Sequence, residues 1–455
     1  MTTERLSNGK VFRYAFYLFC SNLAVMMHMS YLTIFMTDQL LIPVTQVASV
    51  LLAARFIDLL VSLVCGPIIE KAPLPWGKYR SWLKLGQWLV VFSVACMFFN
   101  TTAWPVAFRL GLCFAGYVIL NVTMSFVTNS YYALGPVMAG ANMDDRFRLS
   151  ATSARISPIS MLIVNALIIP SINLLTPVIG AVNAYFAVAV AFTIPYFFGV
   201  AGLNSAAKPY DPDGGGRGVA GRPTVTLRDM LSSMVKNPQM LVLVVSYSLY
   251  YIGNYVISGM VTYYFRYIVG NFTMMAVCST ISMVTGLVTV QFMPALGKKL
   301  GKKRAFIIGL GLYALIRTSL YFIRGNWIGY VIVVILAGAM SYLFTGFGSN
   351  YFVDAGEYYL YETGVDTRTV AVSLYSVPLK MGMMLGNYIG TMGLGLIGYR
   401  AGMTVTPEFT ARFMALMAIV GPAIILLGVA VFALGYKITD EKAAFYAAEN
   451  AKLGT

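Results

Sequence analysis

The residues in this sequence best placed for chemistry are an acid and its neighbours inside a long apolar run. Asp58 is the only acidic residue near the middle of such a run, with Arg55 three positions before it and Ser62 four positions after it. These spacings place all three on one face of a helix. Charges are costly at bilayer depth, so those found there usually have a partner or a task. Two interpretations stay open: a buried Arg55–Asp58 pair that locks helices together, and a site for a cation or a proton.

Polar residues follow helical spacing in four apolar runs, two in each half of the chain. The four sets are Ser21, Asn22 and His28; Asn121, Ser125, Thr128, Asn129 and Tyr132; Tyr247, Tyr251, Asn254, Ser258 and Thr262; and Ser373, Ser376, Lys380 and Asn387. Hydrogen bonds between helices explain any one set. Their presence in both halves indicates the walls of a water-filled cavity. For His28, a packing role and a proton relay both stay open.

The composition places these runs in a membrane. Of the 455 residues, 58% are hydrophobic and 11% are charged, whereas soluble domains are roughly half apolar and a quarter charged. A bilayer-spanning helix needs about 20 mainly apolar residues. Twelve runs meet this need, at roughly 11–37, 43–69, 81–101, 104–138, 154–176, 178–203, 238–267, 272–297, 305–323, 326–352, 369–398 and 411–436. We therefore predict an all-α membrane protein with twelve transmembrane helices.

The cysteines and the single histidine argue against two other kinds of site. The five cysteines are odd in number and lie within apolar runs without a CxxC spacing. A disulfide framework and a zinc site are therefore not expected. Because no nucleophile–base–orienter set or metal cluster emerges, we expect neither an enzyme nor a cofactor.

Basic residues divide the connections between the runs into two sets. The chain has 32 Lys and Arg against 17 Asp and Glu, a net charge of +15. One set of connections, which includes both termini, carries 24 of the 32, while the opposite set carries Arg324, Arg400 and Arg412. Cytoplasmic loops are enriched in this way. We therefore expect both termini in the cytoplasm, and we attribute the charge to topology rather than to nucleic-acid binding.

One long polar segment, residues 204–236, interrupts the pattern after six runs. Its glycine run at 214–216 lacks the strand and the Gly-Lys-Ser/Thr of a phosphate loop, which favours a flexible linker. Basic loops recur at matching places on either side, at 77–80 and 297–304. Such an internal repeat is typical of major-facilitator transporters. The predicted domains are a six-helix half over 1–203, the linker over 204–236, a second six-helix half over 237–437 and a cytoplasmic tail over 438–455.

Several motifs keep the spacing of one transporter family. Residues 54–58 read Ala-Arg-Phe-Ile-Asp, 76–80 read Trp-Gly-Lys-Tyr-Arg, 354–364 run from Asp-Ala-Gly-Glu-Tyr to Thr-Gly, and 378–382 read Pro-Leu-Lys-Met-Gly. Together they resemble the glycoside–pentoside–hexuronide:cation symporters, the family of the melibiose permease. The second helix of that family reads Arg-x-x-Asp-x-x-x-Asp-Pro-x-x-Gly before a Trp-Gly-Lys/Arg loop. The resemblance covers nearly the whole chain and implies a sugar symporter with the major-facilitator fold.

The resemblance also implies a cation site. Asp58 matches the first carboxylate of the family's site, Arg55 matches its neighbouring arginine, and Ser125 stands at a cation-site threonine. Ser62 stands where the family has its second carboxylate. Na⁺ is held by several oxygens, commonly including more than one carboxylate in this family, so the loss of the second acid weakens that cage. We therefore expect coupling to H⁺ rather than to Na⁺, and no other metal site.

A saccharide site follows from the same resemblance. Asn22 and Thr128 stand where the family has aspartates that contact sugar, and Ser21 replaces the lysine before the first of them. Tyr132 matches the sugar-stacking tryptophan, and Arg155 is the best match to the fifth-helix arginine. The polar stripe of the seventh run and the eleventh-helix lysine complete the set. The candidate substrate residues are Ser21, Asn22, Thr128, Tyr132, Arg155, Asn254 and Lys380.

The charge balance of this set predicts the class of substrate. Two acids of the family are replaced by the uncharged Asn22 and Thr128, while Arg155 and Lys380 remain. An arginine at depth favours an anionic group that bridges its guanidinium. We therefore expect an acidic, uronide-type saccharide. A neutral sugar that hydrogen-bonds to Asn22 and Thr128 stays open.

These observations together predict a symporter of the bacterial inner membrane that carries a glycoside or sugar derivative by alternating access. The bacterial assignment rests on the family resemblance alone. We expect a monomer whose partners are the saccharide and the surrounding lipid. Two alternatives stay open: a neutral-glycoside carrier that uses Na⁺ or is uncoupled, and a lipid-handling or sensory membrane protein that keeps the fold.

Overall fold

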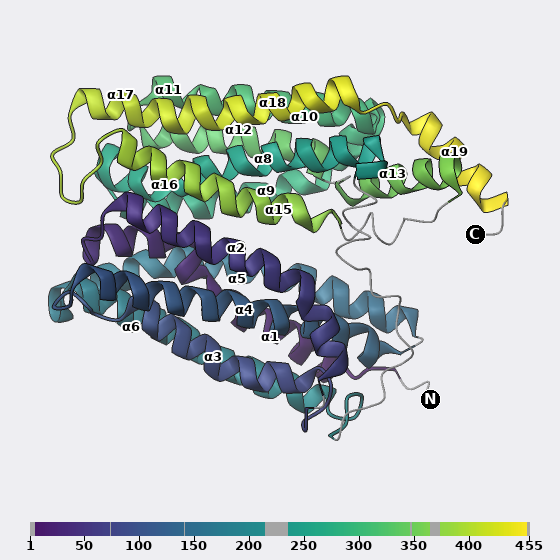
Figure 1. Ribbon diagram of the computed structural model, residues 1–455, viewed down its shortest axis with the longest axis horizontal. Coiled ribbons are helices and arrows are strands. Elements are labelled where there is room, and N and C mark those ends of the chain that lie inside the picture. Colours follow the sequence, from purple (N-terminus) through teal and green to yellow (C-terminus); the bar gives the residue numbers. More distant parts are fainter. Residues whose placement is uncertain are drawn as a thin grey trace. The chain divides into compact units, whose positions relative to one another are not determined.

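The chain folds into two compact helical units, residues 1–224 and 225–455. The structure, a computed structural model, describes residues 5–72, 74–140, 142–213, 235–345, 348–364 and 374–452. Figure 1 shows each unit as a bundle of long helices. The division falls within the predicted linker, of which residues 214–234 lie outside the described ranges, as does Ser373 of the predicted polar stripes.

Six long helices form the first unit, and each matches a predicted apolar run. They are α1 (Asn8–Ile34, continued by the π-helical turn η1, Phe35–Gln39), α2 (Val44–Lys71), α3 (Arg80–Phe98), α4 (Val106–Ala139), α5 (Met143–Ile179) and α6 (Ala181–Ala207). Helix α5 begins before the predicted start at 154. Its first turns are polar, and the Asn142 side chain caps them by accepting the backbone N–H groups of Asp144 and Asp145.

The second unit contains the remaining helices, several of them broken by short irregularities. They are α8 (Pro238–Tyr263), η2 (Tyr264–Ile268), α9 (Thr273–Leu300), α10 (Lys302–Thr318), α11 (Leu320–Ile323), α12 (Trp327–Thr345), α13 (Gly348–Thr363), α15 (Ser376–Met381), η3 (Gly382–Gly386), α16 (Asn387–Leu396), α17 (Pro407–Ala415), η4 (Leu416–Val420), α18 (Gly421–Gly435) and α19 (Asp440–Lys452). Helix α8 packs against α18, α15 and α16, and α10 packs against α12.

The helices meet the length and composition needed to cross a bilayer. Within the described residues, nine segments are long and apolar enough, and Thr273–Gly286 and Trp327–Leu343 add two shorter apolar helices. Helices α15 and α16 form a further run with η3 between them. Large apolar side chains such as Trp88, Phe198 and Leu434 are exposed, as expected where a surface contacts lipid. The predicted all-α, twelve-helix fold is confirmed.

Two helices lie wholly or partly outside the predicted spans. Helix α13 continues past the predicted end at residue 352, and α19 occupies much of the predicted tail. The two helices pack together through Tyr361 and Tyr446, whose ring centres are 5.1 Å apart. The Asn450 side chain also donates to the carbonyl and the carboxylate of Glu357, at 3.0 and 2.6 Å. Hydropathy does not reveal such polar helices, because they are stabilised by contacts with each other and not by contact with lipid.

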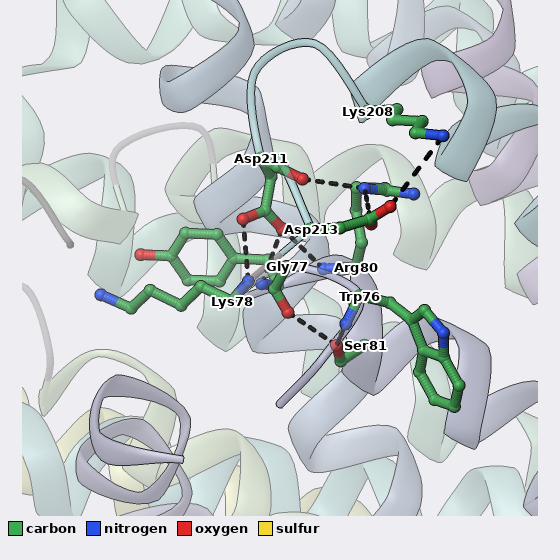
Figure 2. A network of polar contacts seen from close by, with 9 residues as sticks. Trp76, Gly77, Lys78, Arg80, Ser81, Lys208, Asp211 and Asp213 are labelled. Atoms are coloured by element: carbon green, nitrogen blue, oxygen red, sulfur yellow. Dashed lines mark hydrogen bonds and ion pairs between the residues drawn. The ribbon is translucent and has the colours of Figure 1, made fainter. Parts of the chain in front are cut away.

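An acidic residue beyond the last helix of the first unit holds the turn before α3 (Figure 2). Asp211 Oδ1 accepts the backbone N–H of Lys78 at 2.8 Å, and Oδ2 accepts those of Tyr79 and Arg80 at 2.8 and 2.9 Å. Gly77 has a φ of +99°, and a Cβ there would lie 2.7 Å from the Asp211 carbonyl oxygen. The turn therefore needs glycine at 77. The carboxylate also lies at the positive end of the α3 dipole.

The second unit repeats this arrangement before α10. Asp440 Oδ2 accepts the backbone N–H of Lys302 at 3.0 Å, and a Cβ on Gly301, whose φ is +79°, would lie 2.8 Å from the same oxygen. The Lys302 ammonium binds the Asp354 carboxylate on α13. Burial raises the pKa of Asp354, and the Lys302 ammonium acts in the opposite direction. Both turns read Gly-Lys, so the internal repeat indicated by the basic loops extends to the acids that hold them.

Replacing Asp211 with asparagine is expected to lower the thermal unfolding temperature of the purified protein. The amide would turn an NH₂ group toward backbone donors, and a hydrogen bond to a charged group contributes about 1.5–3 kcal/mol. Asp213→Asn is the matched control, because that carboxylate is 51% exposed and pairs with Arg80 and Lys208, where ion pairs contribute about 0–1 kcal/mol. Equal losses of stability for the two variants in detergent would contradict this account.

Candidate functional site

Asp58 and Ser125 meet between two packed helices of the first unit. Ser125 Oγ on α4 donates to Asp58 Oδ1 on α2 at 3.0 Å, and both side chains are half-buried. One turn further along, Asn129 Nδ2 donates to Cys65 Sγ at 3.1 Å and joins the same two helices. The structure therefore brings together two of the four residues predicted for the cation site.

Arg55, the third of these residues, contacts an aromatic ring. Its guanidinium carbon lies 5.2 Å from the centre of the Tyr117 ring on α4, within range of a cation–π interaction. The side chain is buried, and its Nε has no acceptor in the described part of the chain. His28 on α1 meets the same tyrosine edge-on, with ring centres 5.8 Å apart. Tyr117 therefore links Arg55 to His28, a contact that no spacing in the sequence indicates.

Ser62, the fourth predicted residue, is half-buried and bonds within its own helix. Its hydroxyl donates to the backbone carbonyl of Leu59 at 2.7 Å. A serine bonded in this way keeps lone pairs but directs its proton along the helix. Its part in a cation site stays a prediction.

Asn22 joins α1 to α5 and thereby approaches the region of Arg155. Its Nδ2 donates to Ser160 Oγ at 2.7 Å and to Ser157 Oγ at 3.3 Å. With both amide protons given to serines, Asn22 offers its oxygen as an acceptor. Arg155 precedes Ser157 by two positions on α5 and is exposed, whereas Ser21 is only 6% exposed. Ser21 therefore lies in the core, and its neighbour Asn22 is better placed to contact a solute.

Thr128 and Tyr132 extend the face of α4 that carries Ser125. Both are exposed, Tyr132 to 62%. The Tyr132 ring meets Tyr131 edge-on at 5.2 Å, and Tyr131 stacks on the Tyr14 ring of α1 at 4.4 Å. A tyrosine supported in this way presents a ring against which a sugar face can stack.

The second unit contributes Asn254 on α8 and Lys380 on α15, both half-buried. Asn254 Oδ1 accepts the hydroxyl of Tyr313 on α10 at 2.7 Å. Helix α15 runs into η3, where a Cβ on Gly382 would lie 2.2 Å from the Cβ of Tyr251. Glycine at 382 therefore lets the segment that carries Lys380 approach α8 closely.

A further charge, Arg317, lies within the apolar span Lys302–Ile323. Its guanidinium carbon lies 5.3 Å from the centre of the Tyr313 ring, one helical turn away. A charge at bilayer depth usually has a task or a partner, and this applies to Arg317 as it does to Asp58.

Comparisons with known proteins identify the family. The family model for "MFS/sugar transport protein" matches residues 14–440. The chain is 25% identical to an uncharacterized symporter of Bacillus subtilis, covering 97% of this chain and 95% of that one. It is 24% identical to the glucuronide carrier protein homolog of Escherichia coli, over 93% and 91%. It is also 23% identical to a lactose permease of Lactobacillus delbrueckii, over 87% and 64%.

Similarity to solved structures concerns the fold alone. The crystal structure of the nucleoside transporter NupG matches with a TM-score of 0.68 at 12% identity, covering 95% of this chain and all of that one. Together with the twelve helices and the repeated turns, the family match accounts for nearly the whole sequence. The chain therefore belongs to the MFS/sugar transport protein family, in agreement with its resemblance to the glycoside–pentoside–hexuronide symporters.

Proposed function

We propose that this protein is a proton-coupled symporter that moves an acidic saccharide across the bacterial inner membrane by alternating access. As a member of its family it is a membrane transporter and not an enzyme. The observation that carries the proposal is Asp58, a half-buried carboxylate on the apolar helix α2 that accepts a hydrogen bond from Ser125 on α4. Acidic side chains inside transmembrane segments commonly relay protons in transporters.

The surroundings of Asp58 favour a proton over Na⁺ as the coupling ion. A Na⁺ site in this family commonly uses a second carboxylate, and Ser62 occupies that position with its hydroxyl bonded to Leu59. Binding a proton needs no further ligands, since a single carboxylate oxygen can carry it. In this proposal, protonation of Asp58 neutralises the charge between α2 and α4 before the transporter changes conformation.

The polar groups of the first unit favour a saccharide that carries an anionic group. Asn22 offers an acceptor for a sugar hydroxyl, and Tyr132 offers a ring. Arg155, exposed on α5 near the serines that hold Asn22, can form paired hydrogen bonds to a carboxylate. The similarity to a protein named as a glucuronide carrier supports the same class of substrate.

Uptake into proteoliposomes tests this function. A glucuronide and the matching neutral glucoside would be supplied separately, with a pH gradient or a Na⁺ gradient and with or without a protonophore. We expect the glucuronide to accumulate when the outside is acidic, and the protonophore to abolish accumulation. Uptake that needs Na⁺ at constant pH would overturn proton coupling, and uptake of neither sugar would overturn saccharide transport.

A neutral-glycoside carrier is the second candidate, because the similarity to a lactose permease supports it. In that case Asn22 and Thr128 would bind hydroxyls alone, and the glucoside would be taken up at least as well as the glucuronide. In either case we propose a monomer with both termini in the cytoplasm and lipid around its helices. The distribution of basic residues supports that orientation.

A further inference from the structure

Arg317 is a cation inside an apolar helix, and its surroundings are aromatic. Its guanidinium carbon lies 5.3 Å from the centre of the Tyr313 ring, and Tyr330 is a further aromatic neighbour. Arg317 takes part in no ion pair within the described residues, and its Nε has no acceptor there. Tyrosine side chains therefore provide much of the stabilisation of this charge within the apolar helix.

The Tyr313 hydroxyl forms a hydrogen bond to α8. Tyr313 is buried and donates to Asn254 Oδ1 at 2.7 Å. A guanidinium has donors and no acceptor, so Arg317 cannot accept the hydroxyl proton of the neighbouring Tyr313. That proton must reach an acceptor, and the amide of Asn254 can supply one only through its oxygen. Arg317, which cannot accept that proton, therefore favours the arrangement in which the oxygen of the Asn254 amide faces Tyr313.

The other end of the amide stays available. Asn254 is half-buried, and in the described part of the chain its Nδ2 makes no hydrogen bond. With the oxygen engaged by Tyr313, Asn254 can offer a solute only N–H donors. Asn22 in the first unit has the opposite arrangement, because its Nδ2 is engaged by two serines and its oxygen is offered.

We propose that Arg317 and Tyr313 are positioning residues that hold Asn254 as a hydrogen-bond donor, so that α8 selects saccharides with an anionic acceptor group. The inference rests on the proposed function, because it assigns specificity within the same transport reaction. A fixed donor favours a carboxylate over a hydroxymethyl group, and bonds to charged acceptors are the stronger ones. If the amide were free to turn, this discrimination would be reduced.

The test compares two tyrosines that differ in their contact with Asn254. Tyr313→Phe removes the hydroxyl that bonds Asn254, whereas Tyr250→Phe removes the hydroxyl of a neighbouring buried ring that packs edge-on against Tyr313, with ring centres 6.0 Å apart. Inhibition of transport by a glucuronide and by its neutral glucoside gives a selectivity ratio for each variant. We expect Tyr313→Phe to reduce the preference for the glucuronide about fivefold, as one hydrogen bond allows, and Tyr250→Phe to leave it within about twofold.

Asn254→Asp provides an independent test of the same inference. The carboxylate would still accept from Tyr313 but would replace the free donor by an acceptor, so we expect the preference to shift toward the glucoside by more than in Tyr313→Phe. Thermal unfolding in detergent confirms that each variant is folded. Unchanged ratios in Tyr313→Phe and Asn254→Asp, with wild-type uptake intact, would overturn the inference and leave the proposed function standing. No uptake of either sugar by the wild-type protein would overturn both.

Discussion

Asp58→Asn is expected to abolish accumulation of the sugar against a gradient while sugar exchange across the membrane continues. The asparagine oxygen still accepts the Ser125 hydroxyl, which lies 3.0 Å from Oδ1, so the α2–α4 contact is kept and the site for a proton is lost. An anionic sugar that enters with one proton carries no net charge, so the pH gradient drives it: a difference of about 1.7 pH units is equivalent to about 2.3 kcal/mol, and about 1.4 kcal/mol is tenfold. Accumulation should therefore fall from roughly 50-fold to about onefold, measured as steady-state uptake in proteoliposomes.

Two controls separate coupling from damage to the fold. Asp144→Asn makes the same chemical change at an exposed residue in the first turn of α5, and should accumulate sugar as the wild type does. Ser125→Ala removes the hydrogen bond to Asp58 without removing the carboxylate, so it should change the rate and keep accumulation. Full accumulation by Asp58→Asn under a pH gradient would exclude this residue as the coupling site.

The helices that contact lipid could be predicted from the sequence because lipid imposes a composition on them. Each needs about 20 apolar residues, and the run at 43–69 accordingly corresponds to α2 (Val44–Lys71). The polar helix α19 (Asp440–Lys452) is stabilised instead by contacts such as that of Asn450 with Glu357. Those contacts join residues far apart in sequence, and hydropathy carries no signal for them.

Position on a helix predicted which side chains would share a face, but it could not predict partners across helices. Asp58 and Ser125 were both assigned to one site through the family resemblance, and the structure places them 3.0 Å apart. The ring of Tyr117 over Arg55 was not expected, because a tyrosine in an apolar run resembles any packing residue. The acid at 211 is similarly inconspicuous until the fold brings it to the turn at Gly77.

Arg155→Gln is expected to weaken binding of a glucuronide by about tenfold or more and to change binding of the matching glucoside by less than about twofold. A guanidinium that pairs with a carboxylate forms two charge-assisted hydrogen bonds, whereas glutamine offers a neutral amide. Arg155 is exposed on α5, two residues from Ser157, which accepts from Asn22. Binding measured by calorimetry for both sugars gives the two ratios without requiring transport.

The comparison with Arg13→Gln decides whether any arginine would have the same effect. Arg13 is also exposed, and its guanidinium contacts the Ser205 hydroxyl at 3.3 Å near the end of α6. If general electrostatic attraction held the sugar, both substitutions would weaken glucuronide binding alike, and added salt would reduce the difference between the sugars. If Arg155 pairs with the carboxylate directly, its loss alone should erase the difference, and Arg155→Lys should restore only part of it, because an ammonium cannot form the paired contact. Equal or tighter binding of the glucoside by the wild-type protein, unaffected by Arg155→Gln, would instead establish Asn22 and Thr128 as the groups that bind a neutral sugar.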